Sequence, residues 1–316
     1  MLDILAITGP IFILIAVGYA AVRSGLFAKS DTRALGAFVI NIALPAVLFK
    51  ALSQRAFGDV VDGGFLAAYI VGSLAALGFG LLVARRVRAQ PMPKAAMVGM
   101  GMAMSNTAFI GFPVGLQLFG QSAAVALALA MIVENLIMLP LILMLAERGG
   151  GGGRLAVLRQ TLTRLLKNPI VLAIVAGFVA AGLGWQPPTI AAKAIDMAAM
   201  ASAPVALFAI GGALVGQKVR GMVGDLSLIA AGKLLIHPLA VFAMLLVLPP
   251  MDPTLQLAAV LFASAPMFTI YPIFGQKYGQ EGMCAAALVV TTLLSFVTLS
   301  VVVGLLQSGR LAAGLG

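Results

Sequence analysis

The chain has 316 residues, of which 62% are hydrophobic and 9% are charged, and its mean hydropathy is +1.11. A soluble domain has about 45–50% apolar and about 25% charged residues, so this composition excludes a water-soluble globular enzyme. The formal net charge of +10 does not indicate a nucleic-acid partner, because nucleic-acid binders cluster their basic residues on a solvated face. With a single cysteine and a single histidine, we expect no disulfide framework, no metal and no cofactor. The composition predicts an all-α polytopic membrane protein.

A helix needs about 20 apolar residues to cross a hydrocarbon core of about 30 Å. This length predicts ten membrane-spanning helices. They cover residues 2–22, 34–52, 60–84, 94–119, 122–146, 168–185, 191–217, 225–248, 254–276 and 280–306. The first lacks a basic n-region and a clear small-residue cleavage site, so we expect it to be retained and not removed as a signal peptide.

Basic residues are distributed unequally between the two sets of predicted loops. Most of the 20 Lys and Arg residues fall on the side that holds the loop after the first span. The positive-inside rule places that side in the cytoplasm, so we expect a multi-pass protein of the inner (plasma) membrane with both termini outside. The positive charge is therefore mainly an orientation signal, with binding of anionic lipid as the alternative.

The chain resembles itself at a constant offset of 159 residues, which aligns PIFILIAVGYAAVRSGL from Pro10 with PIVLAIVAGFVAAGLGW from Pro169. The same offset aligns Pro45 with Pro204, Ser105 with Ser264, Pro113 with Pro272, and Gln117 with Gln276. We predict two five-helix repeats, residues 1–158 and 159–316. Because five is odd, the second repeat is inverted relative to the first. Inverted repeats are typical of secondary transporters, whose halves alternate about a midplane site.

Two predicted spans at equivalent positions of the repeats contain prolines that interrupt them. Residues 94–119 contain Pro113, and residues 254–276 contain Pro266 and Pro272. A proline in a helix has no N–H and clashes with the carbonyl four residues before it. We therefore expect free carbonyls that need protein or a water-filled cavity to satisfy them, at Phe109, Phe262 and Phe268.

Paired interrupted helices with small polar side chains are the best sequence indicator of a transporter's binding site. Helix N-termini at such breaks favour an anion, whereas free carbonyls favour a cation. Asn41 lies near Pro45, and two roles are left open for it: it could belong to this site, or it could form an interhelical hydrogen bond. The predicted substrate-binding residues are Ser105, Asn106, Thr107, Pro113, Ser264, Pro266, Pro272, Lys233 and Asn41.

Glu134, Lys233 and His237 are ionisable residues well inside predicted spans, where such groups are expensive and mark a pathway or a relay. The offset of 159 residues aligns Lys233 with Leu74 and Glu134 with Leu293, so each charge is present in only one of the two predicted repeats. Lys233 could neutralise an anionic substrate, pair with Glu134 or exchange protons. His237, four residues later on the same helical face, could pack or titrate. We predict Glu134, Asn135 and His237 as proton- or ion-coupling residues, with a structural Glu–Lys clasp as the alternative.

Motifs along nearly the whole chain resemble the auxin efflux carrier family of permeases. They are NIALPAVLF from Asn41, SNTAFIGFPVGLQLFG from Ser105, KNPIVLAIVAGF from Lys167, SAPVALFAIGGAL from Ser202, KLLIHPL from Lys233 and APMFTIYPIFGQKYG from Ala265. The resemblance implies two inverted five-helix halves with broken helices 4 and 9 that cross, a fold shared with bile-acid sodium symporters. It also implies a scaffold of helices 1, 2, 6 and 7, an elevator-like movement of the other helices, and small organic anions such as malonate or malate as substrates.

The chain departs from the plant members of this family in two places. Only a short link with the glycine run 149–153 joins the halves, where plant members have a long cytoplasmic loop. The fourth span carries SNTAFIGFP in place of an NPNTY-type motif, which leaves the substrate open.

The sequence thus predicts a secondary active transporter of small organic anions in the lipid bilayer, and no enzyme. The alternatives are a sodium-coupled symporter of the bile-acid type, and a passive channel or a sensor that binds without transport. Coupling to protons and assembly as a homodimer are left open.

Overall fold

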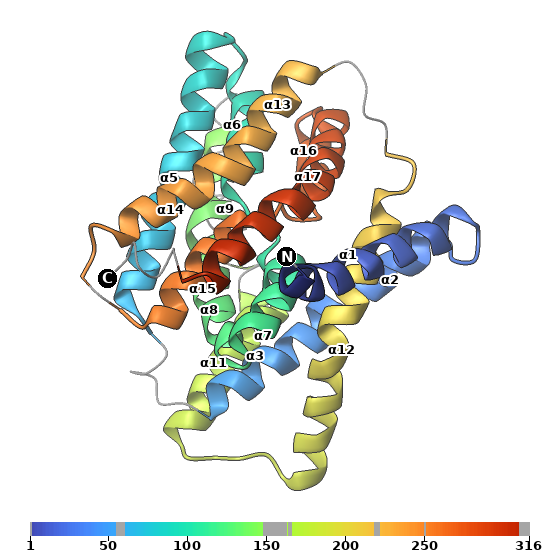
Figure 1. The fold of residues 1–316 in the computed structure, drawn as a ribbon, viewed down its shortest axis with the longest axis vertical. Helices are drawn as coiled ribbons and strands as arrows, with labels where there is room; N and C mark the ends of the chain where they lie inside the picture. The colour runs from blue at the N-terminus through green and yellow to red at the C-terminus, as the bar shows by residue number, and fades with distance from the viewer. Residues whose placement is uncertain are drawn as a thin grey trace. The chain divides into compact units, whose positions relative to one another are not determined.

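The computed structural model describes residues 2–54, 61–147, 163, 166–217, 222–249 and 251–309. Every regular element in these residues is a helix (Figure 1). Seven helical stretches are long and apolar enough to cross a membrane, and three further apolar helices are shorter: Thr107–Phe119, Pro169–Gly182 and Pro253–Ser264. The all-helical prediction is confirmed for the described residues, whereas ten crossings and the inverted repeat stay predictions. The glycine run 149–153 lies outside the described residues.

The chain divides into two compact units. Unit 1 comprises Met1–Gly63, Ala108–Leu129 and Arg164–Val215, and unit 2 comprises Gly64–Thr107, Ala130–Thr163 and Gly216–Gly316. Each unit takes segments from both halves of the sequence. The two units describe which segments pack together, and they do not test whether the sequence is duplicated. The halves 1–158 and 159–316 therefore stay a prediction.

Unit 1 contains the helices that the family resemblance assigns to a scaffold, together with α7 and the first part of α8. Its elements are α1 (Leu2–Arg23), α2 (Lys29–Phe38), η1 (Val39–Ala43), α3 (Leu44–Ser53), α7 (Phe112–Phe119), α8 (Ser122–Ile132), α11 (Pro169–Gly182) and α12 (Thr189–Leu214), where η denotes a π-helical segment. Within this unit α1 packs on α12, and α11 packs on α3.

Glycines bring these two pairs of helices into close contact. A Cβ atom built on Gly18 would lie 2.0 Å from the carbonyl oxygen of Phe208, so only glycine fits there without a shift. A Cβ atom built on Gly177 would lie 3.3 Å from the carbonyl oxygen of Phe49. Small residues allow such close helix packing in membrane proteins. Both the two glycines and the two phenylalanines are separated by the 159 residues of the predicted repeat.

Unit 2 contains the remaining helices. They are α5 (Gly63–Leu82), η2 (Val83–Val87), α6 (Met92–Ala103), η4 (Val133–Met138), α9 (Leu139–Ala146), α13 (Val223–Ala231), η6 (Gly232–Ile236), α14 (His237–Leu245), α15 (Pro253–Ser264), α16 (Tyr271–Lys277) and α17 (Glu281–Gln307). The segment η3 (Thr107–Gly111) connects this unit to α7 of unit 1.

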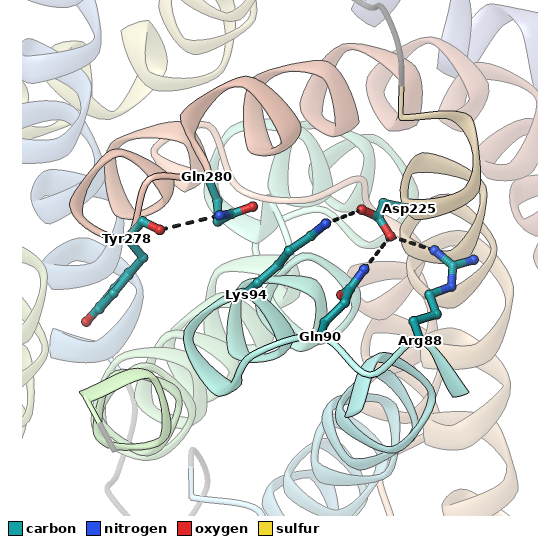
Figure 2. Close-up of polar contacts among 6 residues, drawn as sticks. All are labelled: Arg88, Gln90, Lys94, Asp225, Tyr278 and Gln280. Atoms are coloured by element: carbon teal, nitrogen blue, oxygen red, sulfur yellow. Dashed lines mark hydrogen bonds and ion pairs between the residues drawn. The ribbon is translucent and has the colours of Figure 1, made fainter. Parts of the chain in front are cut away.

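The carboxylate of Asp225, at the start of α13, joins this helix to the segment between η2 and α6 (Figure 2). It accepts hydrogen bonds from Arg88 Nη1 at 2.6 Å and Gln90 Nε2 at 2.8 Å, and it pairs with Lys94 Nζ at 2.8 Å. Two cations and an amide thus surround one carboxylate. These contacts hold three segments of unit 2 together at one end of its helices.

Four of the five π-helical segments in the described residues end two residues before a proline: η1 before Pro45, η3 before Pro113, η4 before Pro140 and η6 before Pro238. A proline cannot donate to the carbonyl four residues back and collides with it. The helix therefore widens by one residue before the proline, which is the geometry of a π-bulge and is frequent at functional sites. The two predicted intramembrane charges, Glu134 and Lys233, lie in η4 and η6.

The breaks in the two interrupted helices lie before Pro113 and Pro272 and not at these prolines. Helix α6 ends at Ala103 and η3 starts at Thr107, whereas α15 ends at Ser264 and α16 starts at Tyr271. Pro272 therefore occupies the first turn of α16, where no N–H is needed, and Pro113 lies inside the continuous helical stretch Thr107–Phe119. The starts of α7 and α16 are also separated by 159 residues.

The expectation of free carbonyls at Phe262 and Phe268 is wrong. The carbonyl of Phe262 accepts from the N–H of Ala265 at 3.2 Å, and that of Phe268 accepts from the N–H of Tyr271 at 3.2 Å. Bonds that span three residues close the ends of the helices and satisfy these groups locally.

Candidate functional site

The two breaks meet inside unit 2. Ser105 and Met267 form an isolated antiparallel β-bridge, and the N–H of Asn106 donates to the carbonyl of Pro266 at 2.7 Å. The side-chain amide of Asn106 also donates to the hydroxyl of Thr269 at 3.0 Å. Non-helical backbone at membrane depth must be satisfied by protein or by a water-filled cavity, and here the two breaks satisfy each other.

Lys233 is fully buried beside this crossing. Its Nζ atom donates to Ser105 Oγ at 2.8 Å, to His237 Nδ1 at 2.8 Å and to the carbonyl of Ala263 at 2.7 Å. An ammonium group has three protons, so all of its donors are used. The carbonyl of Ala263 is one that a continuous helix would bond to the N–H of residue 267, which lies in the break. Lys233 therefore links one break through Ser105 and the other through Ala263.

His237 connects Lys233 to α5. Its Nε2 atom lies 2.9 Å from Ser73 Oγ, and both side chains are fully buried. Because Nδ1 accepts a hydrogen bond from the ammonium group of Lys233, we assign the imidazole proton to Nε2, which then donates to Ser73. His237 is thus a neutral member of the network in this arrangement.

Glu134 is buried in the same unit, on η4. Its Oε1 atom accepts from Tyr69 OH at 3.0 Å and from Thr107 Oγ1 at 2.6 Å. The hydroxyl of Tyr69 also lies 3.4 Å from Ser105 Oγ. Glu134 and Lys233 are not in direct contact as an ion pair, and the hydroxyl groups of Tyr69 and Ser105 lie between them. Glu134 and Lys233 are thus connected through these two hydroxyl groups and do not form the direct clasp that the alternative prediction described.

Several of the predicted residues bond only their own helix. The amide of Asn41 is exposed in unit 1 and donates to the carbonyl of Ala37 at 2.7 Å, so it makes no interhelical bond there. The amide of Asn135 donates to Met131 at 2.9 Å. The hydroxyl of Ser264, although buried, donates to Val260 at 2.7 Å. Pro113 belongs to unit 1 and Pro272 to unit 2. The substrate and coupling roles of all these residues stay predictions.

Sequence reasoning missed Tyr69 and Ser73 on α5. Tyr69 and Ser73 are four residues apart, so they share a helical face, as Lys233 and His237 do on the neighbouring element. One sequence signal indicates Tyr69. It lies far from the ends of its predicted span, and so outside the aromatic belt of the membrane interface.

A second charged contact lies beyond the ends of the predicted spans. The carboxylate of Glu147 accepts from Lys277 Nζ and from Tyr278 OH, the latter at 3.1 Å. The hydrogen bond from Lys277 lowers the pKa of Glu147, and the bond to Glu147 raises the pKa of Lys277. This contact fastens the C-terminal end of α9 to the C-terminal end of α16.

The fold and the site together define a class of protein: an all-helical membrane protein with charged and polar side chains buried around interrupted helices. Such intramembrane charges mark substrate or ion pathways. Within the described residues, no group of three or more His, Cys, Asp or Glu side chains could hold a metal ion. A family model described as "Membrane transport protein" matches residues 7–303, and the chain belongs to this family. This match confirms the resemblance to the auxin efflux carrier family.

The relatives carry names of the same kind. The chain is 30% identical to a protein of Rhizobium meliloti named "Putative malonate transporter", over 100% of this chain and 99% of that protein. It is 25% identical to the "Uncharacterized transporter YfdV" of Escherichia coli, over 91% of this chain and 92% of that protein. It is also 26% identical to the "Lysosomal cholesterol signaling protein" of Mus musculus, over 90% of this chain and 35% of that protein. The family and these names indicate a multi-pass membrane transporter and not an enzyme.

Proposed function

We propose that the chain is a secondary active transporter of small organic anions, with dicarboxylates such as malonate and malate as the substrate class. The observation that carries this proposal is the buried ammonium group of Lys233, which is hydrogen-bonded to both breaks of the interrupted helices. A positive charge at a crossing of broken helices is complementary to an anion at membrane depth. The name of the Rhizobium relative points to the same substrate class.

The substrate carboxylate would bind beside the crossing, where the side chains of Ser105, Asn106 and Thr107 supply hydrogen-bond donors. Lys233 has no unused donor in this arrangement, so the carboxylate has to replace one of its three acceptors. The hydroxyl of Ser105 is the acceptor that exchanges at lowest cost, because a hydroxyl can turn to another partner whereas the carbonyl of Ala263 cannot. Pro266 and Pro272 shape the second break, and Ser264 ends the helix before it.

Transport would follow from a duplicated architecture of ten helices in two inverted halves. The corresponding starts of α7 and α16, and the corresponding contacts of Gly18 and Gly177, support this duplication. The two compact units supply the two bodies that an elevator-like cycle of alternating access requires. We place the protein in the inner membrane with both termini outside, on the basis of the positive-inside rule.

The test is counterflow of radiolabelled malonate in liposomes that contain the purified protein and unlabelled malonate. The wild type should show saturable counterflow, and Asn106→Ala and Lys233→Met should lose at least about tenfold in transport, which corresponds to about 1.4 kcal/mol of interaction with the substrate. Lys193→Met is the matched control, because Lys193 is exposed in unit 1. Asn106→Ala tests the site independently if Lys233→Met does not fold.

Other outcomes would reject the proposal in distinct ways. Flux without saturation or counterflow would indicate a channel, and binding without flux would indicate a sensor. Uptake driven by a sodium gradient and insensitive to pH would favour the bile-acid type of symporter. Normal transport by both site variants would show that the substrate binds elsewhere.

A further inference from the structure

The hydroxyl of Tyr69 is a single donor that faces three oxygen atoms. It lies 3.0 Å from Glu134 Oε1 and 3.4 Å from both Ser105 Oγ and Thr107 Oγ1, and it has only one proton to give. The shortest contact is the one to the carboxylate, as a charge-assisted hydrogen bond requires. Ser105 is in turn the partner of Lys233 at 2.8 Å. Tyr69 therefore stands between the acidic and the basic group of the site.

The charges at this site balance before any substrate enters. Glu134 and Lys233 are both buried and carry opposite charges, and His237 is neutral in the arrangement described above. An anion that enters this low-dielectric region adds a charge that nothing compensates, which is costly. One proton on Glu134 lowers the cost, because it leaves the charge of Lys233 to face one carboxylate of the anion.

From this geometry we propose that Glu134 is the proton-binding group of the transporter, and that Tyr69 couples its protonation to the release of Lys233 for the substrate. The inference rests on the proposed function. A proton from the aqueous side forms an O–H bond on Glu134, and no other covalent bond changes. The carboxyl group then needs one donor fewer, so Tyr69 turns its proton from Glu134 to Ser105. Ser105 gains a new hydrogen-bond partner, and Lys233 can exchange Ser105 for the substrate carboxylate.

No other charged group near Glu134 competes for this role in the described residues. The elements of unit 2 that carry the site contribute Tyr69 from α5, Lys233 from η6 and His237 from α14, and α15 contributes none. Lys94 of α6 pairs with Asp225 of α13, and Lys277 of α16 pairs with Glu147. The hydroxyl of Tyr271 on α16 donates to the carbonyl of Met97 at 2.6 Å. On α17, Glu281 is exposed in the first turn, and Cys284 is a buried thiol.

The decisive measurement is calorimetric titration of the purified protein with malonate, in buffers that differ in their enthalpy of ionisation. At neutral and alkaline pH, the wild type should take up about one proton for each malonate bound, and its affinity should rise as the pH falls. Glu134→Gln keeps the shape of a protonated carboxyl group, so it should bind malonate without proton uptake. In liposomes, this variant should keep counterflow and lose accumulation driven by a pH gradient.

Tyr69→Phe separates the coupling from the proton site. It removes the donor between Glu134 and Ser105, so it should keep proton uptake and lose about tenfold in malonate affinity, or about 1.4 kcal/mol. Tyr19→Phe and Glu281→Gln are the matched controls, since both residues are exposed and lie outside the site.

Malonate binding by the wild type without proton uptake would overturn the inference, even if no variant folds. Accumulation by Glu134→Gln under a pH gradient would also overturn it. A wild type that neither binds nor exchanges a small carboxylate would instead refute the proposed function, and this inference with it.

Discussion

At the scale of single residues, the interior of unit 2 tolerates charge because Lys233 and Glu134 are both hydrogen-bonded. A lysine at the centre of a membrane helix costs about 2.5–3.5 kcal/mol on insertion scales, and hydrogen bonds to charged groups return about 1.5–3 kcal/mol each. Lys233 makes three such bonds and Glu134 accepts two. The network is stable only as a whole, because a lost partner leaves another group buried and unsatisfied.

Ser73 tests this dependence at a position that carries no charge. In Ser73→Ala, the Nε2 proton of His237 loses its acceptor, and we expect a loss of about 1–3 kcal/mol in the free energy of unfolding. Thermal unfolding of the purified protein in detergent measures the change. Ser53→Ala is the matched control, because the hydroxyl of Ser53 bonds Lys50 of its own helix and should contribute little. Equal melting temperatures of the two variants would show that the bond to His237 is dispensable.

The pair of Glu147 and Lys277 gives a pH dependence whose sign can be worked out. The pKa of Glu147 lies below its ordinary value of 4.5, so its contribution to stability is present above pH 4.5 and is lost as the pH falls through the lowered pKa. The pKa of Lys277 is raised above 10.5, so its contribution is present below pH 10.5 and is lost as the pH rises through the raised pKa.

We therefore expect Glu147→Gln to be less stable than the wild type at neutral pH, by at most about 1 kcal/mol because the side chain of Lys277 is 59% exposed. The difference should disappear on acidification below the lowered pKa of Glu147. Melting curves across acidic pH measure this, with Glu281→Gln as the control. A difference that persists at low pH would mean that the side chain of Glu147 acts through packing and not through its charge.

At the scale of elements, prolines control where the helices widen and where they start. A proline that interrupts the hydrogen-bond pattern of an apolar helix places a π-helical segment just before it, as at Pro140 and Pro238. Each π-bulge adds one residue, which turns the preceding segment by about 100° relative to the following one. The prolines thereby set the direction in which Glu134 and Lys233 point.

Pro238→Ala should remove this effect in η6. Alanine restores an N–H that can bond the carbonyl of Leu234, so the segment Gly232–Ile236 should revert to an α-helix. Lys233 would then turn away from Ser105 and Ala263. We expect a lower melting temperature and lost counterflow, in spite of the better helix propensity of alanine. Pro10→Ala is the control, because α1 has a proline and no π-helical segment. An unchanged melting temperature would show that other packing orients Lys233.

The contact between α1 and α12 allows a test with a control on the same helix. In Gly18→Ala the new methyl group would lie 2.0 Å from the carbonyl oxygen of Phe208, and such overpacking costs about 1–3 kcal/mol. In Gly9→Ala the methyl group would meet nothing within 4 Å, so better helix propensity should leave stability unchanged or raise it by up to about 1 kcal/mol. Thermal unfolding compares the two variants. Equal stability would contradict the close approach.

Sequence reasoning could predict the helices, because the thickness of a bilayer fixes the length of an apolar segment. It could also predict that Lys233 and His237 share a face, which follows from a spacing of four residues. It did not predict the bonds that satisfy the carbonyls of Phe262 and Phe268, because such local bonds at helix ends have no sequence signal. It missed Tyr69, whose partner Glu134 is 65 residues away, because only tertiary packing brings the two together.

At the scale of the whole molecule, we predict that the excess of basic residues determines the orientation of the protein in the membrane. The net charge of +10 is concentrated in one set of loops of the predicted topology. Alkaline phosphatase fused after the C-terminus should therefore be active, since it folds only outside the cytoplasm. Green fluorescent protein at the same position should be dark. The opposite pair of signals would contradict the predicted orientation of the C-terminus.

The hydrogen bond from Lys233 to Ala263 also has a consequence for biosynthesis. The chain is made from its N-terminus, so Ser105 and His237 can reach Lys233 early, whereas Ala263 follows 30 residues later. The helix that carries this ammonium group therefore emerges from the ribosome before α15, which supplies its third acceptor. We expect it to wait at the translocon, or at the membrane surface, until α15 has emerged. The two helices would then enter the lipid as a pair.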